Sequence, residues 1–409
     1  MRVNAILISL IVLLTISNTS TWDKQLLTKL AVVITPLADA TNYSLQFFDA
    51  NRLVGKIYAE LPFAPEIGEK SCARSHQLLF NEVVRIKQIV KDEVECEIFN
   101  VFYEEKSRKQ VRSFWILKKN IRLLSELKKN ILLAIPYPYT QDRKRSLNNI
   151  VTLAWPWYDS ITKQFYSAGT RFVRNIMSDT VDHYGAYIFQ PFFKTIKKVL
   201  IPYKYAVVDY PADITKAIKK MVNLLRQWTA QASIIPYVWG GCSYIHSFAD
   251  NNFMLTTQER YGQTLSFWTR PDSKIPHSGF ECSGLIFRAA QIYGLSYYLK
   301  NTATIVHHLE PLTKKDILED GDLIWYSGHV LLVSDKDNNK VIESVGYKAG
   351  FGKIHEVPLS RVFQDITTYD DLLKAYQEKK TIKRLTVAGN IFRTINRFLL
   401  LKMNSIVKL

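Results

Sequence analysis

A change in hydrophobic period near residue 211 divides the chain into a strand-rich part and a part that begins with a helix. Before it, segments such as 93–98 alternate apolar and acidic residues, which is the period of a half-buried strand. Over 211–231 the apolar residues instead recur at helical spacing, at Ile214, Ile218, Val222, Leu225 and Trp228. We therefore expect an α+β fold, and its 409 residues suggest more than one domain.

The strand-rich part is expected to hold two small β-barrels. Short strands with turn residues between them recur over 65–127, and a second group recurs over 165–210. The segment 128–164, rich in aromatic and turn residues, is expected to link the two barrels. Residues 21–64 are expected to form a helical or irregular segment.

The first 20 residues have the features of a secretory signal peptide. Arg2 supplies a short positive head, 5–16 is mostly apolar, and small polar residues follow. The apolar run is shorter than a comfortable membrane span. We therefore expect an exported protein, periplasmic or secreted and associated with the cell envelope. An uncleaved membrane anchor is the alternative, because no clear Ala-x-Ala cleavage pattern follows.

The net charge favours anionic partners. The 54 Lys and Arg residues against 37 Asp and Glu give +17 at pH 7, which suits nucleic acid, acidic lipid or an acidic cell-wall polymer. No nucleic-acid-binding motif is present, so nucleic acid is not expected as a partner. The tail 371–409 is basic and amphipathic, and 383–409 is expected to be a surface helix docked on the body rather than a membrane or wall contact.

The cysteine spacing excludes two common kinds of site. Cys72, Cys96, Cys242 and Cys282 form no Cys-x-x-Cys pair, so zinc and thioredoxin-type sites are excluded, and no metal or other cofactor is expected. Cys72 and Cys96 could form a local disulfide in an oxidising compartment. Cys242 is expected to be a small buried residue, and the alternative is a redox partner that caps Cys282.

One cysteine occupies the position of a nucleophile. Cys282 lies between a glycine-led turn and a helical pattern in GFECSGLIFRAAQIYG, residues 279–294. At a helix start, the dipole and free backbone N–H groups would lower the pKa of the thiol and could stabilise an oxyanion. His329, at the head of a predicted strand, is the candidate base. Glu343, on the strand after the next turn, is the candidate that orients the imidazole, and a solvated strand glutamate is the equal alternative. Other histidines have weaker contexts, namely His183, His246, His307, His308 and His355.

These motifs, in this order, resemble those of the NlpC family of papain-like cell-wall cysteine peptidases. The segments that carry the resemblance are Tyr237-Val238-Trp239-Gly240-Gly241, Cys282-Ser283-Gly284, Asp320-Gly321-Asp322-Leu323-Ile324, Gly328-His329-Val330 and Val341-Ile342-Glu343-Ser344. The resemblance implies a papain-like catalytic domain at 211–370. It also implies that Cys282 attacks an amide bond of a peptidoglycan stem peptide, with His329 as base.

The upstream part extends the resemblance. Gln77-Leu78-Leu79-Phe80-Asn81-Glu82 is similar to the Gln-Leu-Leu-Phe-Gly-Glu signature of the bacterial SH3-like barrels that precede such peptidases. This architecture resembles γ-D-glutamyl-L-diamino-acid endopeptidases, which implies murein fragments with a free N-terminal L-Ala as substrates. The resemblance assigns Tyr237 to the oxyanion site and gives Glu281 and Ser283 substrate-binding roles, with the carboxylate of Glu281 binding the substrate amine.

Three features depart from the family pattern. Glu281 stands where the family usually has Asp, and Glu343 stands where it commonly has His. The stretch 243–280 is longer than usual and is expected to form a lid or an extra wall over the cleft.

From the leader-like start and the motifs together, we expect an exported cysteine peptidase. The alternatives are a catalytically silent wall-binding protein and a thiol acyltransferase on the same fold.

Overall fold

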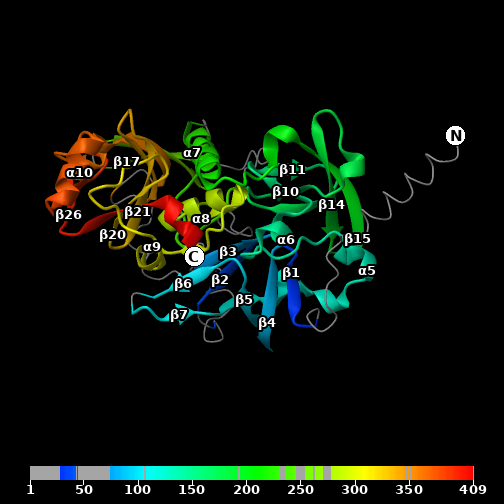
Figure 1. The fold of residues 1–409 in the computed structure, drawn as a ribbon. Helices are drawn as coiled ribbons and strands as arrows, with labels where there is room; N and C mark the ends of the chain where they lie inside the picture. The colour runs from blue at the N-terminus through cyan, green and yellow to red at the C-terminus, as the bar shows by residue number, and fades with distance from the viewer. Residues whose placement is uncertain are drawn as a thin grey trace.

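The computed structural model describes residues 28–42, 44, 74–105, 107–191, 194–230, 235–245, 254–260, 263–269, 278–346, 349 and 352–408. The expected signal peptide at 1–20 lies outside the described residues, and so does Cys72. The fold mixes α and β structure and consists mostly of sheets (Figure 1). Within the described residues, no helix is long and apolar enough to cross a bilayer.

The first sheet is seven-stranded, in the order β3-β2-β8-β5-β4-β1-β9. Its strands are β1 (Leu30–Val33), β2 (Leu37–Thr41), β3 (Arg74–Leu79), β4 (Val83–Val90), β5 (Glu93–Ile98), β8 (Phe114–Leu117) and β9 (Ile121–Leu123). The expectation of helical or irregular structure at 21–64 is therefore wrong for 28–42. The physical reason is that β1 is buried on both faces: Ala31 and Val33 enter one core, whereas Leu30 and Val32 enter another.

The second sheet has five strands in the order β15-β14-β13-β10-β16. They are β10 (Ile150–Leu153), β13 (Arg171–Arg174), β14 (His183–Gln190), β15 (Thr195–Pro202) and β16 (Ala206–Val207). The segment 128–164 is not merely a linker, because it supplies β10 to this sheet. The four residues of β10 are all buried, and β10 pairs with both β13 and β16. The same segment also contains α5 (Lys129–Leu132), α6 (Arg143–Leu147) and β11 (Trp157–Asp159).

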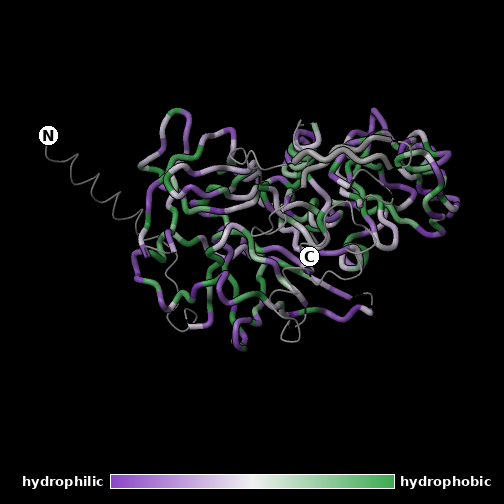
Figure 2. Tube along the Cα trace, turned by 180° about the vertical axis from the view of Figure 1, so that it is seen from behind, coloured by the Kyte–Doolittle hydropathy of each residue, from purple (hydrophilic) through white to green (hydrophobic). Residues whose placement is uncertain are grey.

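A third sheet forms the centre of the C-terminal part, in the order β23-β22-β21-β20-β27. It consists of β20 (Leu323–Tyr326), β21 (His329–Asp335), β22 (Lys340–Val345), β23 (Lys353–Pro358) and β27 (Phe398–Leu401). The helices α7 (Ile214–Ala230) and α8 (Cys282–Ile292) pack on one face, and α10 (Tyr369–Gln377) packs on the other. The strand β21 reads as a continuous apolar run because Val330 and Leu332 face the first core while Leu331 and Val333 face the second. Figure 2 shows hydrophobic stretches through the interior and hydrophilic residues on many outer loops.

The expectation of a surface helix at 383–409 is wrong. This part of the chain forms β25 (Ile382–Leu385), β26 (Ile391–Ile395), β27 and the 3-10 helix η6 (Met403–Lys408). The apolar period in β27 is two, because Phe398 and Leu400 enter the core beside α10 whereas Leu401 enters the core beside α8. The tail is therefore an integral part of the third sheet, with β27 paired to β20.

A buried arginine joins the first sheet to the helix that carries Cys282. Arg288 on α8 is almost completely buried, and its Nη1 lies 2.7 Å from a carboxylate oxygen of Glu82. Its Nε donates to the carbonyl of Cys242 at 2.9 Å, and its Nη2 donates to that of Gln77 at 3.3 Å. The Gln77–Glu82 motif therefore docks the first sheet onto α8.

We expect an Arg288→Met variant to lose about 3 kcal/mol of unfolding free energy, because Glu82 would remain as a poorly solvated charge without its cation. Denaturant unfolding monitored by tryptophan fluorescence measures this loss. The matched control is Arg85→Met, which removes an arginine from an exposed ion pair with Glu97 at 3.0 Å and should cost less than about 1 kcal/mol. Equal losses in the two variants would contradict a docking role for Arg288.

Candidate active site

The helix α8 begins at Cys282, as the sequence predicted, with Glu281 as its N-cap. Glycines occur in the first turn of α8 and in the turn at 240–241 because the backbone approaches other backbone closely at both places. A Cβ on Gly284 would overlap the carbonyl oxygen of Gly241, so the first turn of α8 lies directly against the turn that precedes it. Gly240 has φ +67° and faces the carbonyl of Arg74, where a side chain would be both strained and obstructed.

Cys282 and His329 line the same cleft, which has a volume of about 500 Å³. Cys282 is half-buried, and the backbone groups of Val330 and Ser283 act on its thiol to lower the pKa. Because Val330 directly follows His329 in β21, Cys282 lies near the start of the strand that begins with His329.

The thiol is not activated in the way that its place at a helix start predicted. Burial, reinforced by the neighbouring Glu281 carboxylate, raises the pKa of Cys282 to about 12. Burial also lowers the pKa of His329, although Glu343 opposes this effect. Both shifts favour the neutral forms of these two cleft-lining side chains, a thiol and an imidazole.

We expect iodoacetamide to alkylate Cys282 slowly at neutral pH and progressively faster as the pH rises toward the thiol pKa of about 12. The reason is that only the thiolate reacts, and a raised pKa leaves little of it at neutral pH. Peptide mapping by mass spectrometry across a pH series measures the rate, with a small free thiol as reference. Fast alkylation in weakly acidic solution would instead reveal a thiolate–imidazolium pair and contradict this assignment.

Glu343 in β22 is buried and holds the imidazole of His329. It is 1 % exposed, so it is not a solvated strand glutamate. His329 Nε2 lies 2.7 Å from its Oε2, which leaves Nδ1 as the ring nitrogen available to the thiol. Burial alone would raise the pKa of Glu343, but the Arg384 guanidinium and hydrogen bonds from His329 and His355 hold it well below its usual range.

Two partners of Glu343 were not predicted from the sequence. Arg384 in β25 donates to both carboxylate oxygens, at 3.0 Å and 2.6 Å, and is itself 2 % exposed. His355 lies directly opposite Glu343 in β23 and contacts Oε1 through Nε2 at 2.9 Å. The cross-strand register could have identified His355. No local signal could have identified Arg384, which follows 41 residues later in the expected surface helix.

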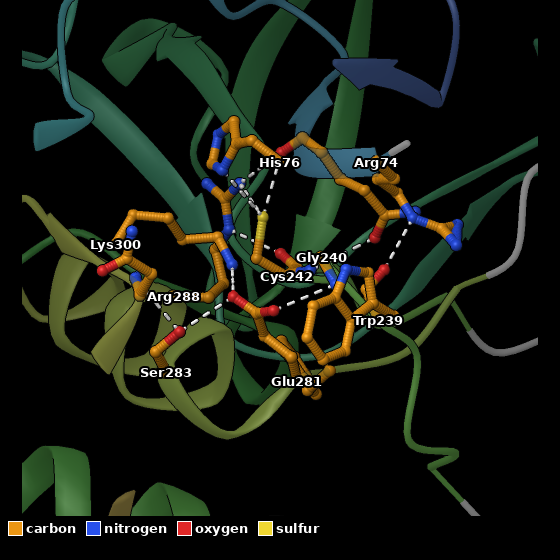
Figure 3. A network of polar contacts seen from close by, with 12 residues as sticks. Arg74, His76, Trp239, Gly240, Cys242, Glu281, Ser283, Arg288 and Lys300 are labelled. Atoms are coloured by element: carbon orange, nitrogen blue, oxygen red, sulfur yellow. Dashed lines mark hydrogen bonds and ion pairs between the residues drawn. The ribbon is translucent and has the colours of Figure 1, made fainter. Parts of the chain in front are cut away.

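The three predicted substrate-side residues all line the cleft. Tyr237 precedes the glycine turn, and its backbone N–H donates to Gly352 at 2.8 Å. Glu281 accepts the backbone N–H of Gly240 at 3.0 Å through Oε2 and the hydroxyl of Ser283 at 2.8 Å through Oε1. Figure 3 shows this network, in which Glu281 also forms an ion pair with Lys300.

The cleft is walled by segments far apart in the chain. Arg74, Ser75 and the turn after β6 (Phe102–Glu104) line it from the N-terminal part, whereas Phe392 and Arg393 of β26 line it from the C-terminal part. The expected lid at 243–280 is described only at 243–245, 254–260, 263–269 and 278–280. Its role as a lid or extra wall stays a prediction. Within that stretch, β17 (Met254–Arg260) and β18 (Gln263–Thr269) pair as an antiparallel hairpin.

Five other residues named in the sequence analysis do not line the cleft, namely His183, His307, His308, Cys96 and Cys242. His246 lies outside the described residues. His307 and His308 are not free surface groups, because both contact the carboxylate of Glu104, at 2.7 Å and 3.1 Å. Cys242 and Cys96 are buried free thiols, and Cys242 lies 3.4 Å from His76 Nδ1. In the described part of the chain, no group of three or more His, Cys, Asp and Glu side chains is arranged to hold a metal ion.

Comparison with solved structures identifies a similar fold. An NlpC/P60 family protein from Bacillus cereus matches with a TM-score of 0.51 and 13% identity, over 84% of this chain and 96% of that one. NlpC2 and NlpC1 from Trichomonas vaginalis also match, each with a TM-score of 0.29, at 13% and 12% identity. These two matches cover 81% and 84% of this chain and 92% and 91% of theirs. No family model and no curated protein matches the sequence. At this identity the likeness to the Bacillus cereus protein shows the fold alone.

Proposed function

We propose that this protein is a cysteine peptidase that hydrolyses amide bonds in peptidoglycan stem peptides. The observation that carries the proposal is the arrangement of Cys282, at the start of α8, and the Glu343-bound His329 in one cleft. The fold similarity to an NlpC/P60 family protein supports it. A cysteine at a helix start, a base and a residue that orients the base together form the minimal machinery of thiol acyl transfer.

The reaction starts from the neutral thiol and the neutral imidazole. His329 Nδ1 takes the proton from Cys282 as the sulfur attacks the amide carbonyl, and Glu343 stabilises the imidazolium that forms. Backbone N–H groups at the start of α8, together with Tyr237, stabilise the oxyanion. The imidazolium then protonates the leaving amine, and a thioester on Cys282 remains. Water, deprotonated by His329, hydrolyses the thioester and restores the thiol.

The finer parts of the proposal concern the substrate and the setting. The bond cleaved is the one between γ-D-Glu and the diamino acid, and the two N-terminal sheets act as SH3-like barrels before a papain-like domain. Walls contributed by the N-terminal part narrow the cleft, which supports short stem peptides or murein fragments as substrates. Export and contact with an anionic wall remain proposals, supported by the leader-like first residues and the charge of +17.

The proposal is tested by incubating the reduced protein with synthetic stem peptides that carry L-Lys or diaminopimelate after D-Glu. We expect mass spectrometry to show release of the L-Ala-D-Glu portion by wild type and no release by Cys282→Ala. The matched control is Cys96→Ala, which removes a buried thiol from the first sheet and should retain activity. Absence of cleavage of every stem peptide would overturn the proposal. Transfer of the acyl group to an added amine in place of water would assign an acyltransferase.

A further inference from the structure

We propose that Arg393 binds a carboxylate of the amino acid that leaves on cleavage, and so selects stem peptides in which that carboxylate is free. This inference rests on the proposed function and adds a specificity-determining residue to it. Arg393 belongs to β26, in the part of the chain that was expected to be a surface helix. It lies outside every motif that carries the resemblance to the peptidase family.

The guanidinium of Arg393 is anchored close to His329. Its Nη2 donates to the carbonyl of Ser327 at 3.1 Å, two residues before His329 in the chain. Its Cζ lies 5.0 Å from the centre of the Tyr326 ring, and the centre of that ring lies 5.4 Å from the centre of the His329 imidazole. Arg393, Tyr326 and His329 all line the cleft that contains Cys282. The wall that carries the base therefore also carries a guanidinium.

The chemistry of the proposed reaction brings the leaving group to this wall. His329 protonates the departing amine, so that nitrogen must lie within hydrogen-bond reach of the imidazole. The acyl half of the substrate stays on Cys282, at the start of α8. A Cβ on Gly328 would meet nothing within 4 Å, so the wall beside the base is open. The rest of the leaving residue would extend over Gly328 toward Phe392 and Arg393, which continue the wall.

The charges of the cleft differ between its walls. The acidic side chains that line it come from the segment 104–105 and from Glu281, the N-cap of α8. Around His329 the lining residues are aromatic, aliphatic or glycine, apart from His329 itself and Arg393. Among the described residues, no carboxylate is paired with Arg393. A guanidinium without a counter-charge suits a carboxylate, which it can bind through two parallel hydrogen bonds.

A leaving diamino acid can supply this carboxylate from two places. Diaminopimelate carries one at the end of its side chain, and a stem peptide that ends at the diamino acid carries another at its C-terminus. Phe392 is 40 % exposed and offers apolar surface to the methylene groups of the diamino acid. An amide in place of the bound carboxylate would keep the shape of the peptide but remove the charge that Arg393 requires.

The experiment compares three forms of L-Ala-γ-D-Glu-meso-diaminopimelate. In the first, both carboxylates of the diamino acid are free, and in the other two either the side-chain or the C-terminal carboxylate is amidated. For wild type we expect kcat/KM to fall at least about tenfold with one of the amidated peptides, because a charge-assisted hydrogen bond is lost. That peptide identifies the carboxylate that Arg393 binds. Arg393→Met should cleave it as fast as it cleaves the free acid, whereas Arg393→Lys should keep part of the difference.

The matched control is Arg397→Met, because Arg397 is an exposed arginine close to Arg393 in the chain and does not line the cleft. This variant should keep the wild-type ratio. Equal kcat/KM for the three peptides in wild type would overturn the inference while the peptidase assignment stands. A wild-type ratio in Arg393→Met would also overturn it, because another residue would then recognise the carboxylate. Failure of wild type to cleave any of the three would overturn the proposed function, on which the inference rests.

Discussion

We expect an Arg384→Met variant to lose about 3–5 kcal/mol of unfolding free energy and most of the proposed peptidase activity. Among the described contacts, Arg384 is the only arginine or lysine side chain on the buried Glu343 carboxylate, whose other partners are His329 and His355. Without the guanidinium, an ionised Glu343 could remain buried only at a large cost in free energy. The alternative is that Glu343 takes up a proton and becomes neutral. A protonated Glu343 would no longer stabilise the imidazolium of His329.

Denaturant unfolding and kcat/KM for a stem peptide measure the two effects of this substitution. The matched control for stability is Arg393→Met, because Arg393 lies opposite Arg384 in β26 but is only half-buried. The Arg393→Met variant should lose less than about 1 kcal/mol of unfolding free energy. An Arg384→Met protein as stable and as active as wild type would show that Glu343 does not depend on this cation.

We expect Glu343→Gln to lower kcat/KM by about 10²-fold or more. A glutamine presents one oxygen and one NH₂ group where the carboxylate now accepts from His329, His355 and Arg384 on both oxygens. At least one donor would therefore face another donor, and no negative charge would remain to stabilise the imidazolium. The single variant also leaves Arg384 buried without a counter-charge, so it should unfold more easily than wild type.

A double variant separates the chemical role of Glu343 from its structural role. Glu343→Gln combined with Arg384→Met removes both buried charges, so it should regain part of the lost stability but not the rate. Glu97→Gln, an exposed strand glutamate paired with Arg85, serves as the matched control for the amide substitution. A Glu343→Gln protein with wild-type kcat/KM across the pH range would remove Glu343 from the mechanism.

Local patterns account for the parts of the site that the sequence predicted. The helix over 282–292 follows from a glycine-led turn and a helical apolar period, both of which lie within a dozen residues. The contact between His329 and Glu343 follows from one hairpin, whose turn residues mark both strand ends. Side chains that are close in sequence meet by strand register alone, so no tertiary knowledge was needed.

Tertiary packing accounts for what the sequence did not predict. The pKa of Cys282 is raised because the cleft buries it, and the cleft walls come from as far away as Arg74 and Arg393. The tail was expected to be a helix because its basic and apolar residues also fit a helical period, and only pairing with β20 selects strand β27. The strand β1 is so short that its four buried residues carry no clear period.

The most direct test is to look for the thioester on Cys282. Wild-type protein is quenched in acid during turnover of a stem peptide, and its proteolytic peptides are mapped by mass spectrometry. We expect the acyl half of the substrate on the peptide that contains Cys282, in a form released by hydroxylamine. Turnover with an unmodified Cys282 peptide, and equal turnover by Cys282→Ala, would contradict thiol catalysis at this site.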